Sequence, residues 1–445
     1  MGHGSWLIST TYELRTLNNQ KNRMGINGEY QYKSLLRFTT AGSVDDGKST
    51  LIGRLLYDSK SIFKDQMDHI IESSKRLGRE DIDLSLLTDG LRAEREQGIT
   101  IDVAYRYFAT PRRKFIIADT PGHIQYTRNM VTGASTADLA VILIDARKGV
   151  LEQTLRHSYI ATLLDIRHIV FCINKMDMVD YSGSVFNKIK GELEGVANKL
   201  KIEYTYYIPI SAKFGDNVVD ASAKMEWYTG ETFLRLIETI EIKKDENSHQ
   251  ARFPVQTIIR PLSTEYHDYR GYAGRVAGGI LNTGDEVTIL PSFINSRIKS
   301  IDLMGKHRSL ASSGDSISIT LEDQIDISRG DMIVKTSEIP EVGQEITLMA
   351  CWFNERPLKP GGRYIVRNNT NESGCQIKSV NYRININTFE KDTDDLTLKM
   401  NDIANISIRT SKPLFFDNYQ KNNITGSLIF IEEGTNETVG AGMIE

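Results

Sequence analysis

The sequence predicts an α/β domain, built on a mostly parallel β-sheet with helices on both faces, followed by two β-barrel domains. Three observations support this fold class. Between residues 34 and 241, short apolar runs alternate with longer amphipathic stretches, as in strands joined by crossover helices. Beyond residue 251 the chain changes to short strands separated by turn residues. The length of 445 residues is enough for about three domains.

Composition narrows the class of protein. Lys and Arg total 54 against 58 Asp and Glu, a net charge of −4, and 40% of residues are hydrophobic. This balance is typical of a soluble globular protein and argues against non-specific binding to nucleic acid or anionic membrane. Three separated cysteines, Cys172, Cys351 and Cys375, form neither a disulfide framework nor a zinc cluster. With no apolar run of 18 or more residues and no secretory signal, we expect a cytoplasmic protein without a membrane or nucleic-acid partner.

The first 33 residues lack clear periodicity, so we expect an N-terminal extension over residues 1–33. The α/β domain then covers residues 34–241. Its predicted strands are 35–40, 114–119, 139–145, 168–174 and 204–210. Its predicted helices are 48–57, 124–132, 152–164, 185–199 and 231–239.

The second half of the chain reads as β structure. A charged stretch, Lys243 to Glu246, predicts a linker over residues 242–251. One barrel is expected at 252–338 and another at 343–445, separated by a Pro and a Gly within 339–343. Asn282-Thr283-Gly284-Asp285 and Ser312-Ser313-Gly314-Asp315 are predicted turns.

A phosphate-binding loop is predicted directly after the first strand, where it opens a helix. Its residues are Gly42, Ser43, Val44, Asp45, Asp46, Gly47, Lys48 and Ser49, with Thr50 following. The glycines let successive N–H groups face phosphates, Lys48 reaches the β- and γ-phosphates, and the Ser49 hydroxyl suits Mg²⁺. An accidental glycine turn would match this pattern in about one or two chains per hundred of this length. The flanking strand and helix favour the functional interpretation.

A second loop follows the strand at 114–119. It consists of Asp119, Thr120, Pro121 and Gly122. A carboxylate at the end of a parallel strand beside a phosphate loop can hold Mg²⁺ through water, and the Gly122 amide can reach the γ-phosphate. Alone, this tetrapeptide would be an ordinary turn.

Two further loops predict recognition of guanine. Asn174, Lys175, Met176 and Asp177 end the strand at 168–174, and Ser211, Ala212 and Lys213 follow the last strand. The Asp177 carboxylate can accept two hydrogen bonds from guanine that adenine cannot donate, which selects GTP. Each motif is weak by itself, and Ser211 alone would read as a helix N-cap. The order of four motifs, each at a strand end, is the strong signal.

These motifs in this order resemble a P-loop GTPase of the translation-factor class. The stretch at 94–102 is similar to the first switch of that class, in which Thr100 gives Mg²⁺ a second hydroxyl ligand. His123 matches the residue that positions the attacking water, and Val44 with Ile99 resembles the apolar gate before it. Without the motif, Thr100 would be a β-former and His123 a structural histidine at a helix start.

Within that class, the chain more closely resembles the family of large, GTP-hydrolysing subunits of bacterial sulfate adenylyltransferase. Elongation factors usually have His at the position of Asp46. The resemblance runs through 37–58, 125–135, 354–358 and 435–444, although family members usually have Glu where this chain has Ile124. It implies GTP and Mg²⁺ as cofactors and a small adenylyl-transferring partner subunit, in a heterodimer or higher assembly. GTP hydrolysis would drive formation of adenosine 5′-phosphosulfate and pyrophosphate from ATP and sulfate.

An elongation-factor-like GTPase that delivers aminoacyl-tRNA is the alternative, but the arginines beyond residue 252 are dispersed. No second phosphate loop occurs, so we expect no fused kinase domain of the kind that some relatives carry. We interpret Cys172 as an apolar filler, and His157 and His168 as structural. The group of Tyr266, His267, Tyr269 and Tyr272 is interpreted as barrel packing.

Overall fold

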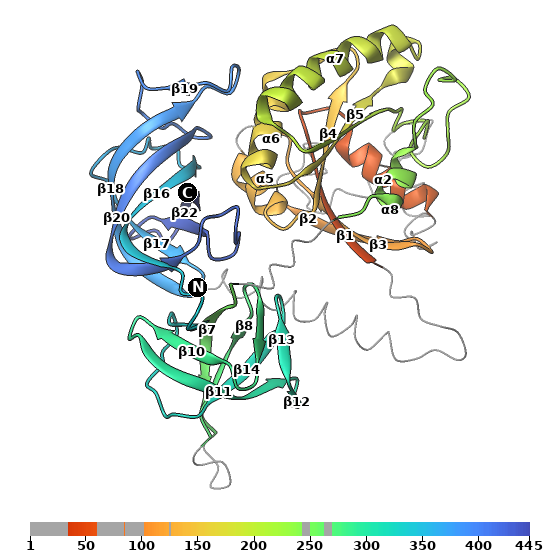
Figure 1. The fold of residues 1–445 in the computed structure, drawn as a ribbon. Coiled ribbons are helices and arrows are strands. Elements are labelled where there is room, and N and C mark those ends of the chain that lie inside the picture. The colour runs from red at the N-terminus through yellow and green to blue at the C-terminus, as the bar shows by residue number, and fades with distance from the viewer. Residues whose placement is uncertain (1–33, 60–83, 85–101, 124–125, 243–249, 262–268) are drawn as a thin grey trace, which may run out of the picture.

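The computed structural model describes residues 34–59, 84, 102–123, 126–242, 250–261 and 269–445. These residues form an α/β unit and two barrels (Figure 1). The expected fold class, an α/β domain with a mostly parallel sheet followed by two β-barrels, is confirmed.

The α/β unit is built on a sheet with the strand order β2-β3-β1-β4-β5-β6. All neighbouring pairs are parallel except β2 and β3. The bounds are β1 Ser34–Gly42, β2 Ala104–Ala109, β3 Arg113–Asp119, β4 Leu139–Asp145, β5 His168–Asn174 and β6 Tyr204–Pro209. β4 and β5 lie fully buried, as continuous apolar runs in a covered parallel sheet should. Five predicted strands are confirmed, with ends shifted by two residues at most.

Strand β2 was not predicted. Its exposed and covered side chains alternate, with Tyr105 and Tyr107 exposed, so it lacks the apolar run that marked the other strands. As an antiparallel edge strand it needs only one covered face. The search for buried parallel strands therefore missed it.

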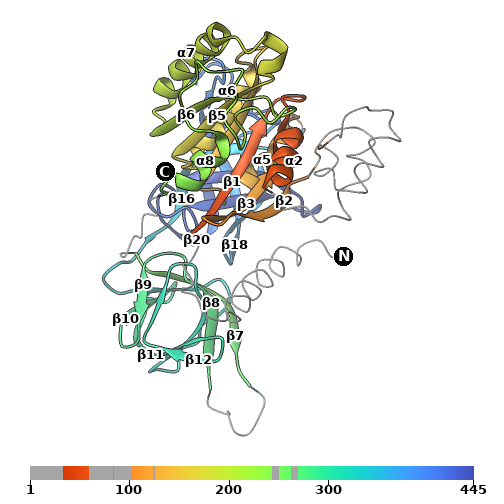
Figure 2. The same cartoon turned by 90° about the vertical axis from the view of Figure 1, so that its right-hand side faces the viewer.

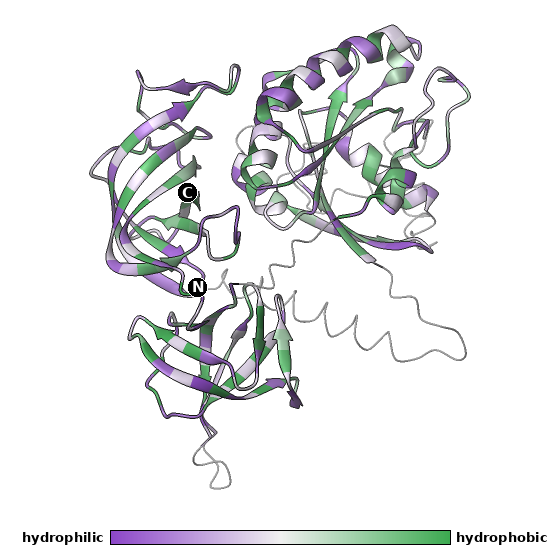
Figure 3. Ribbon diagram, viewed as in Figure 1, coloured by the Kyte–Doolittle hydropathy of each residue, from purple (hydrophilic) through white to green (hydrophobic). Residues whose placement is uncertain are grey.

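Helices cover both faces of this sheet. The bounds are α2 Lys48–Asp58, α5 Thr127–Ala134, α6 Glu152–Leu163, α7 Gly183–Leu200 and α8 Phe233–Thr239, with a 3₁₀ turn, η3, at Met176–Val179. Side chains of α2 and α8 pack on one face, and those of α5, α6 and α7 on the other. Figure 3 shows this amphipathic pattern, with hydrophobic green on the sheet and hydrophilic purple along the outer side of α7.

Helix ends follow local capping. Ser182 and Thr232 accept backbone hydrogen bonds three residues ahead, so α7 begins two residues before, and α8 two residues after, the predicted starts. The start predicted for α5, at residue 124, lies outside the described residues, and the described helix begins at Thr127.

The first barrel closes with six strands in the order β10-β15-β7-β8-β14-β11, because β10 also pairs with β11. Figure 2 looks into this ring. Its strands are β7 Arg252–Ile259, β8 Gly271–Arg275, β9 Ile280–Asn282, β10 Glu286–Leu290, β11 Ile294–Leu303, β12 Lys306–Arg308, β13 Leu310–Ser312, β14 Ser316–Leu321 and β15 Met332–Lys335. Both predicted turns occur, with Gly284 and Gly314 at positive φ.

The second barrel closes in the same way, in the order β17-β21-β22-β16-β20-β18 with β17 paired to β18. Its strands are β16 Glu341–Trp352, β17 Arg363–Asn368, β18 Asn371–Ile384, β19 Lys391–Asp392, β20 Ile403–Phe416, β21 Ser427–Ile431 and β22 Thr438–Ile444. β16 begins two residues before the barrel start expected at residue 343.

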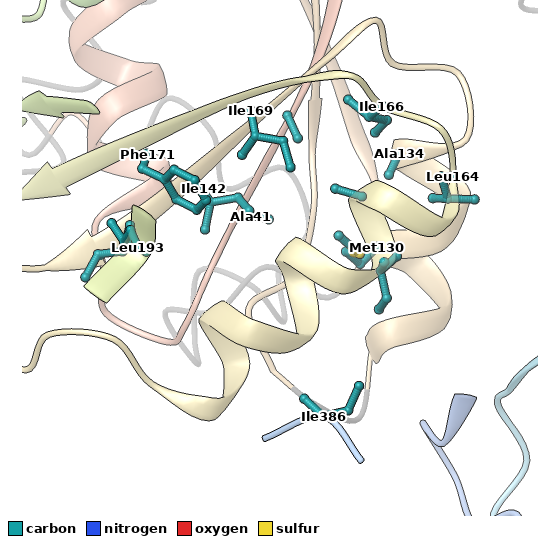
Figure 4. Close-up of a cluster of buried hydrophobic side chains, with 14 of the residues drawn as sticks. Ala41, Met130, Ala134, Ile142, Leu164, Ile166, Ile169, Phe171, Leu193 and Ile386 are labelled. Atoms are coloured by element: carbon teal, nitrogen blue, oxygen red, sulfur yellow. The ribbon is translucent and has the colours of Figure 1, made fainter. Parts of the chain in front are cut away.

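The second barrel contacts both other units. It faces α5 and α6 of the α/β unit, where one buried cluster includes residues of both units, among them Met130, Leu164 and Ile386 (Figure 4). On its other side, Asp417 accepts two hydrogen bonds from Arg252 of the first barrel, at 2.9 and 3.0 Å. The second barrel therefore contacts both of its neighbours, and Figure 1 shows it beside the α/β unit and above the first barrel.

Candidate functional site

The predicted motifs meet at one edge of the sheet. They follow β1, β3, β5 and β6, which are parallel, so their carboxyl ends point the same way. The site is therefore built from four loops on a rigid sheet.

The phosphate loop has the backbone of a tight curl. Gly42, Asp45 and Gly47 have φ values of 152°, 66° and 94°. A Cβ on Gly47 would lie 2.4 Å from the Asn174 side-chain nitrogen, so this position needs glycine. Ser49 and Thr50 follow in the first turn of α2, and Val44 lies half-buried in the loop.

Lys48 is directed back into its own loop. It is 7% exposed, and its Nζ donates to the carbonyls of Gly42 and Ser43, both at 2.9 Å. Burial lowers the pKa of Lys48, while the negative charges of Asp119, Asp46 and Asp45 raise it. The Lys48 ammonium is therefore held in one position by two backbone carbonyls of the phosphate loop.

The Asp119 loop lies next to this ammonium. Asp119 is 1% exposed and accepts a hydrogen bond from the Thr40 hydroxyl at 3.2 Å. Thr120 donates to the Thr40 carbonyl at 2.5 Å, and Pro121 is buried beside it. A Cβ on Gly122 would lie 2.7 Å from the Gly42 carbonyl oxygen and 2.4 Å from Lys48 Nζ, and because the carbonyl belongs to the backbone this position needs glycine.

Asn174 joins the phosphate loop to the Ser-Ala-Lys turn. Its side-chain nitrogen donates to the Asp46 carbonyl at 2.7 Å, and its oxygen accepts from the Ala212 amide at 2.9 Å. Ser211 donates to the Asp177 carboxylate at 2.6 Å. Three of the four predicted motifs are therefore bonded to one another through side chains.

The residues before Asp177 are held by contacts with Ile210 and Asp145. Met176 is fully buried, and its amide donates to the Ile210 carbonyl at 3.2 Å. Lys175 has φ 63°, and its ammonium lies 3.1 Å from Asp145. Although burial raises it, hydrogen bonds from Arg147 and Lys175 hold the pKa of Asp145 well below its usual range. Lys213 lies near the rim, with its ammonium 5.0 Å from the Phe214 ring centroid.

His123 directly follows Gly122 and is half-buried. Its ring makes an edge-on contact with Tyr126, with centroids 6.1 Å apart. Thr100, Ile99 and Ile124 lie outside the described residues, so the predicted switch threonine is not placed, and of the predicted gate only Val44 is described.

Sequence reasoning missed two groups near the site. Asp145 ends β4 at the same sheet edge, and the strand-end rule used for Asp119 would have found it. Gln153 on α6 lies with its side-chain nitrogen 3.5 Å from the Gly122 carbonyl and 3.3 Å from His157 Nε2. No local signal marks Gln153, because the contact spans 31 residues.

Other expectations can be compared with the described residues. His157 is 1% exposed and Cys172 is fully buried. Tyr272 is buried in the barrel core, whereas Tyr266 and His267 lie outside the described residues. Among the residues that the structure describes, no cluster of three His, Cys, Asp or Glu could hold a metal. No helix in that part of the chain is long and apolar enough to cross a membrane.

Comparison with known proteins identifies close relatives. Residues 33–253 match the family described as elongation factor Tu GTP binding domain, and residues 345–445 match the GTP-eEF1A C-terminal domain-like family. Sulfate adenylyltransferase subunit 1 of Sulfurovum sp. is 49% identical over 439 residues, covering 96% of this chain and 91% of that protein. The same subunit of Aeromonas hydrophila is 50% identical over 416 residues, covering 93% and 86%. The bifunctional enzyme CysN/CysC of Mycobacterium tuberculosis is 50% identical over 412 residues, covering 92% and 67%.

A solved structure supports the fold alone. The Saccharomyces cerevisiae Ski7 GTPase-like domain, bound to GDP and inorganic phosphate, matches with a TM-score of 0.53 at 16% identity. The match covers 93% of this chain and 97% of that one.

Proposed function

Because this chain belongs to the sulfate adenylyltransferase subunit 1 family, we propose that it is the GTPase subunit of an ATP sulfurylase. In this proposal, GTP hydrolysis drives formation of adenosine 5′-phosphosulfate and pyrophosphate from ATP and sulfate. The observation that carries the proposal is the bridge made by Asn174 between Asp46 and Ala212. It aligns a phosphate loop with a guanine-type loop on one sheet edge.

Guanine is proposed to bind between the loops that carry Asn174 and Ser211. The Asp177 carboxylate would accept from the two guanine donors, while Ser211 keeps that carboxylate oriented. The Ala212 amide would lie near guanine O6. Lys175 and Lys213 would border the base.

The phosphates are proposed to bind in the curl of residues 42–50. Backbone N–H groups and the start of α2 face them, and Lys48 supplies the cation. Because its Nζ is already held by two carbonyls of the loop, Lys48 needs little reordering when phosphates arrive.

Mg²⁺ fits the donor set of this region. The Ser49 hydroxyl and, through water, the Asp119 carboxylate are oxygen donors of the type that Mg²⁺ prefers, and Thr100 is proposed as the second hydroxyl. When bound, Mg²⁺ would neutralise phosphate charge during hydrolysis.

His123 is proposed to position the attacking water. It comes directly after Gly122, whose amide would face the γ-phosphate. Val44 and Ile99 would form an apolar gate in front of it. Positioning and electrostatics account for most catalysis of this kind, so His123 need not be a strong base.

We assign the GTPase domain to residues 34–241, the linker to 242–251 and the barrels to 252–338 and 343–445. The partner is proposed to be a small adenylyl-transferring subunit, and the setting cytoplasmic. Delivery of aminoacyl-tRNA is the disfavoured alternative, since the relatives near 50% identity are sulfate adenylyltransferase subunits.

The test uses the complex of this chain with its small subunit. The rate of adenosine 5′-phosphosulfate formation should rise when GTP is added, and Lys48→Ala should abolish the increase because the phosphates lose their main cation. Lys188→Ala, an exposed lysine on α7, is the matched control and should behave as the unaltered chain. A rate that is indifferent to GTP would refute the coupling.

A further inference from the structure

We propose that the Asp46 side chain is a positioning group of the phosphate loop. By accepting the Ser43 amide hydrogen, it holds the loop in the curl that receives the phosphates. This inference rests on the proposed GTP site. There, Asp46 was assigned only as part of the loop backbone, and the inference adds a role for its side chain.

The contact is short and closes a turn. Asp46 Oδ2 lies 2.6 Å from the Ser43 amide nitrogen, and the Asp46 amide lies 3.3 Å from the Ser43 carbonyl. The chain between them passes through Asp45 at φ 66°. That φ is uncommon for a residue with a side chain, and the two bonds between Ser43 and Asp46 favour the turn that contains it.

Asp46 is bound on its backbone as well. Its carbonyl accepts from Asn174, so the side chain fixes the start of the loop while the carbonyl fixes it to the guanine side. Gly42 lies close to both β4 and the Asp46 side chain, since a Cβ on Gly42 would lie 2.9 Å from the Leu143 carbonyl and 3.3 Å from Asp46 Oδ2. The carboxylate thus sits where the loop leaves β1.

A turn with the same two bonds occurs in the first barrel, away from the sheet edge that carries the predicted motifs. Asp315 Oδ2 accepts from the Ser312 amide at 2.9 Å, and the Asp315 amide donates to the Ser312 carbonyl at 3.0 Å. In both turns a Ser and an Asp three residues later form the two bonds, although the residues between them differ. Asp315 remains half-exposed, whereas Asp46 is 1% exposed.

Burial makes Asp46 a costly choice. Its Oδ1 is buried and makes no hydrogen bond within the described structure. The pKa of the Asp46 carboxyl is raised, mainly by burial and slightly by Asp145, although Lys48, the Ser43 amide and Lys148 act to lower it. A carboxylate also repels phosphates. The feature that benefits the loop is therefore the acceptor atom, and the charge is unfavourable.

Acceptor and charge can be separated by substitution. Asp46→Asn keeps an oxygen in reach of the Ser43 amide and removes the charge. Asp46→Ala removes both and leaves the Ser43 amide without its partner, so the free loop samples other shapes and must be reordered on binding. Asp315→Ala removes the same bond from the barrel turn and is the matched control.

The experiment measures affinity of the full chain for a fluorescent GDP analogue with Mg²⁺ present, together with melting temperature without nucleotide. Asp46→Ala should weaken binding about tenfold, a loss typical of one buried hydrogen bond. Asp46→Asn should bind within about threefold of the unaltered chain or more tightly. Asp315→Ala should melt earlier and bind unchanged.

Two results would overturn the inference. One is unchanged affinity in a folded Asp46→Ala protein, which would make the bond merely structural. The other is an Asp46→Asn protein that binds as weakly as Asp46→Ala, which would give the role to the charge. If Asp46→Ala does not fold, Asp46→Asn still decides the question, because it keeps the acceptor and removes the charge. Failure of the unaltered chain to bind the analogue would instead refute the proposed function.

Discussion

The two contact surfaces of the second barrel differ in their main contacts, although a small apolar cluster of Phe415 with Leu290, Met332 and Val334 also crosses to the first barrel. Against the α/β unit it presents apolar side chains, including Ile386, Met349 and Tyr419, that share one buried cluster with α5 and α6. We call this the helix interface. Against the first barrel it presents Asp417, which pairs with Arg252 at 2.9 Å while both remain below 10% exposed. We call this the ion-pair interface.

Directionality separates the two interfaces. Apolar burial is non-directional and tolerates small shifts of one surface over another. A buried ion pair is stable only in one geometry, because its desolvation is offset by short, well-aligned bonds. We therefore expect the two barrels to keep one mutual orientation, while the helix interface allows the α/β unit more freedom. The polar contact from Arg156 to the Asn401 carbonyl, at 2.8 Å, limits that freedom.

The largest effect should come from breaking the ion pair. Asp417→Ala leaves Arg252 buried without its partner and also removes the acceptor of the Thr425 hydroxyl. We expect a loss of about 3–5 kcal/mol in the free energy of unfolding. Chemical denaturation measures it, with Asp326→Ala as control, since that carboxylate is 95% exposed and its pair with Arg270 should contribute under 1 kcal/mol or so. A loss below about 1 kcal/mol for Asp417→Ala would show that this interface is not held by the pair.

Trimming the helix interface should cost less. Ile386 is 7% exposed and belongs to the buried cluster that also includes Met130 and Leu164 (Figure 4). Ile386→Ala should lower the free energy of unfolding by about 2 kcal/mol. The surface control is Ile424→Ala, because the Ile424 side chain is 36% exposed. Equal effects for both variants would argue against an apolar interface here.

A pH effect is expected from the interior of the α/β unit, at a histidine that belongs to neither interface. Burial, with the positive charges of Lys48 and Arg156, lowers the pKa of His157 to about 3. The folded state therefore keeps His157 neutral while the unfolded chain gains a proton below pH 6.5 or so. Stability from this group is complete above about pH 6.5 and falls by up to about 1.4 kcal/mol per unit toward pH 3. Denaturation of His157→Gln should show a flatter pH profile than the unaltered chain; parallel profiles would contradict this.

The smallest effect is expected at the margin of the ion-pair interface. Asn422 donates to the Ala277 carbonyl at 2.7 Å, across the two barrels. Asn422→Ala should lower the free energy of unfolding by about 1 kcal/mol. Gln344→Ala, which removes an exposed bond to the Ser411 carbonyl within one barrel, should have less effect. Thermal unfolding compares them, and a larger loss for Gln344→Ala would reverse the assignment.

Local patterns were sufficient for the main architecture. Apolar runs located β4 and β5 to the residue, and turn residues located both barrel turns around Gly284 and Gly314. β2 escaped because an edge strand needs only alternate covered residues. Apolar runs and turn residues are patterns within a few neighbouring residues, and a single sequence reveals patterns of that range.

Contacts between distant residues could not be predicted in this way. The Arg252 and Asp417 pair spans 165 residues, and the bridge from Asn174 to Asp46 spans 128. Strand ends indicated which residues share the sheet edge, but only packing decides which of them bond. The Asp46 contact with Ser43 is local, yet it depends on a backbone φ at Asp45 that composition does not disclose.

The second barrel contacts two units that precede it in the chain. Residues 341–445 follow both of these units in the sequence and pack against each of them. While a ribosome is still translating, α6 and Arg252 therefore lack these partners, and the nascent chain carries an uncovered apolar surface and an unpaired cation. Joining of the three units becomes a late step that requires β20 and its Asp417 to have emerged.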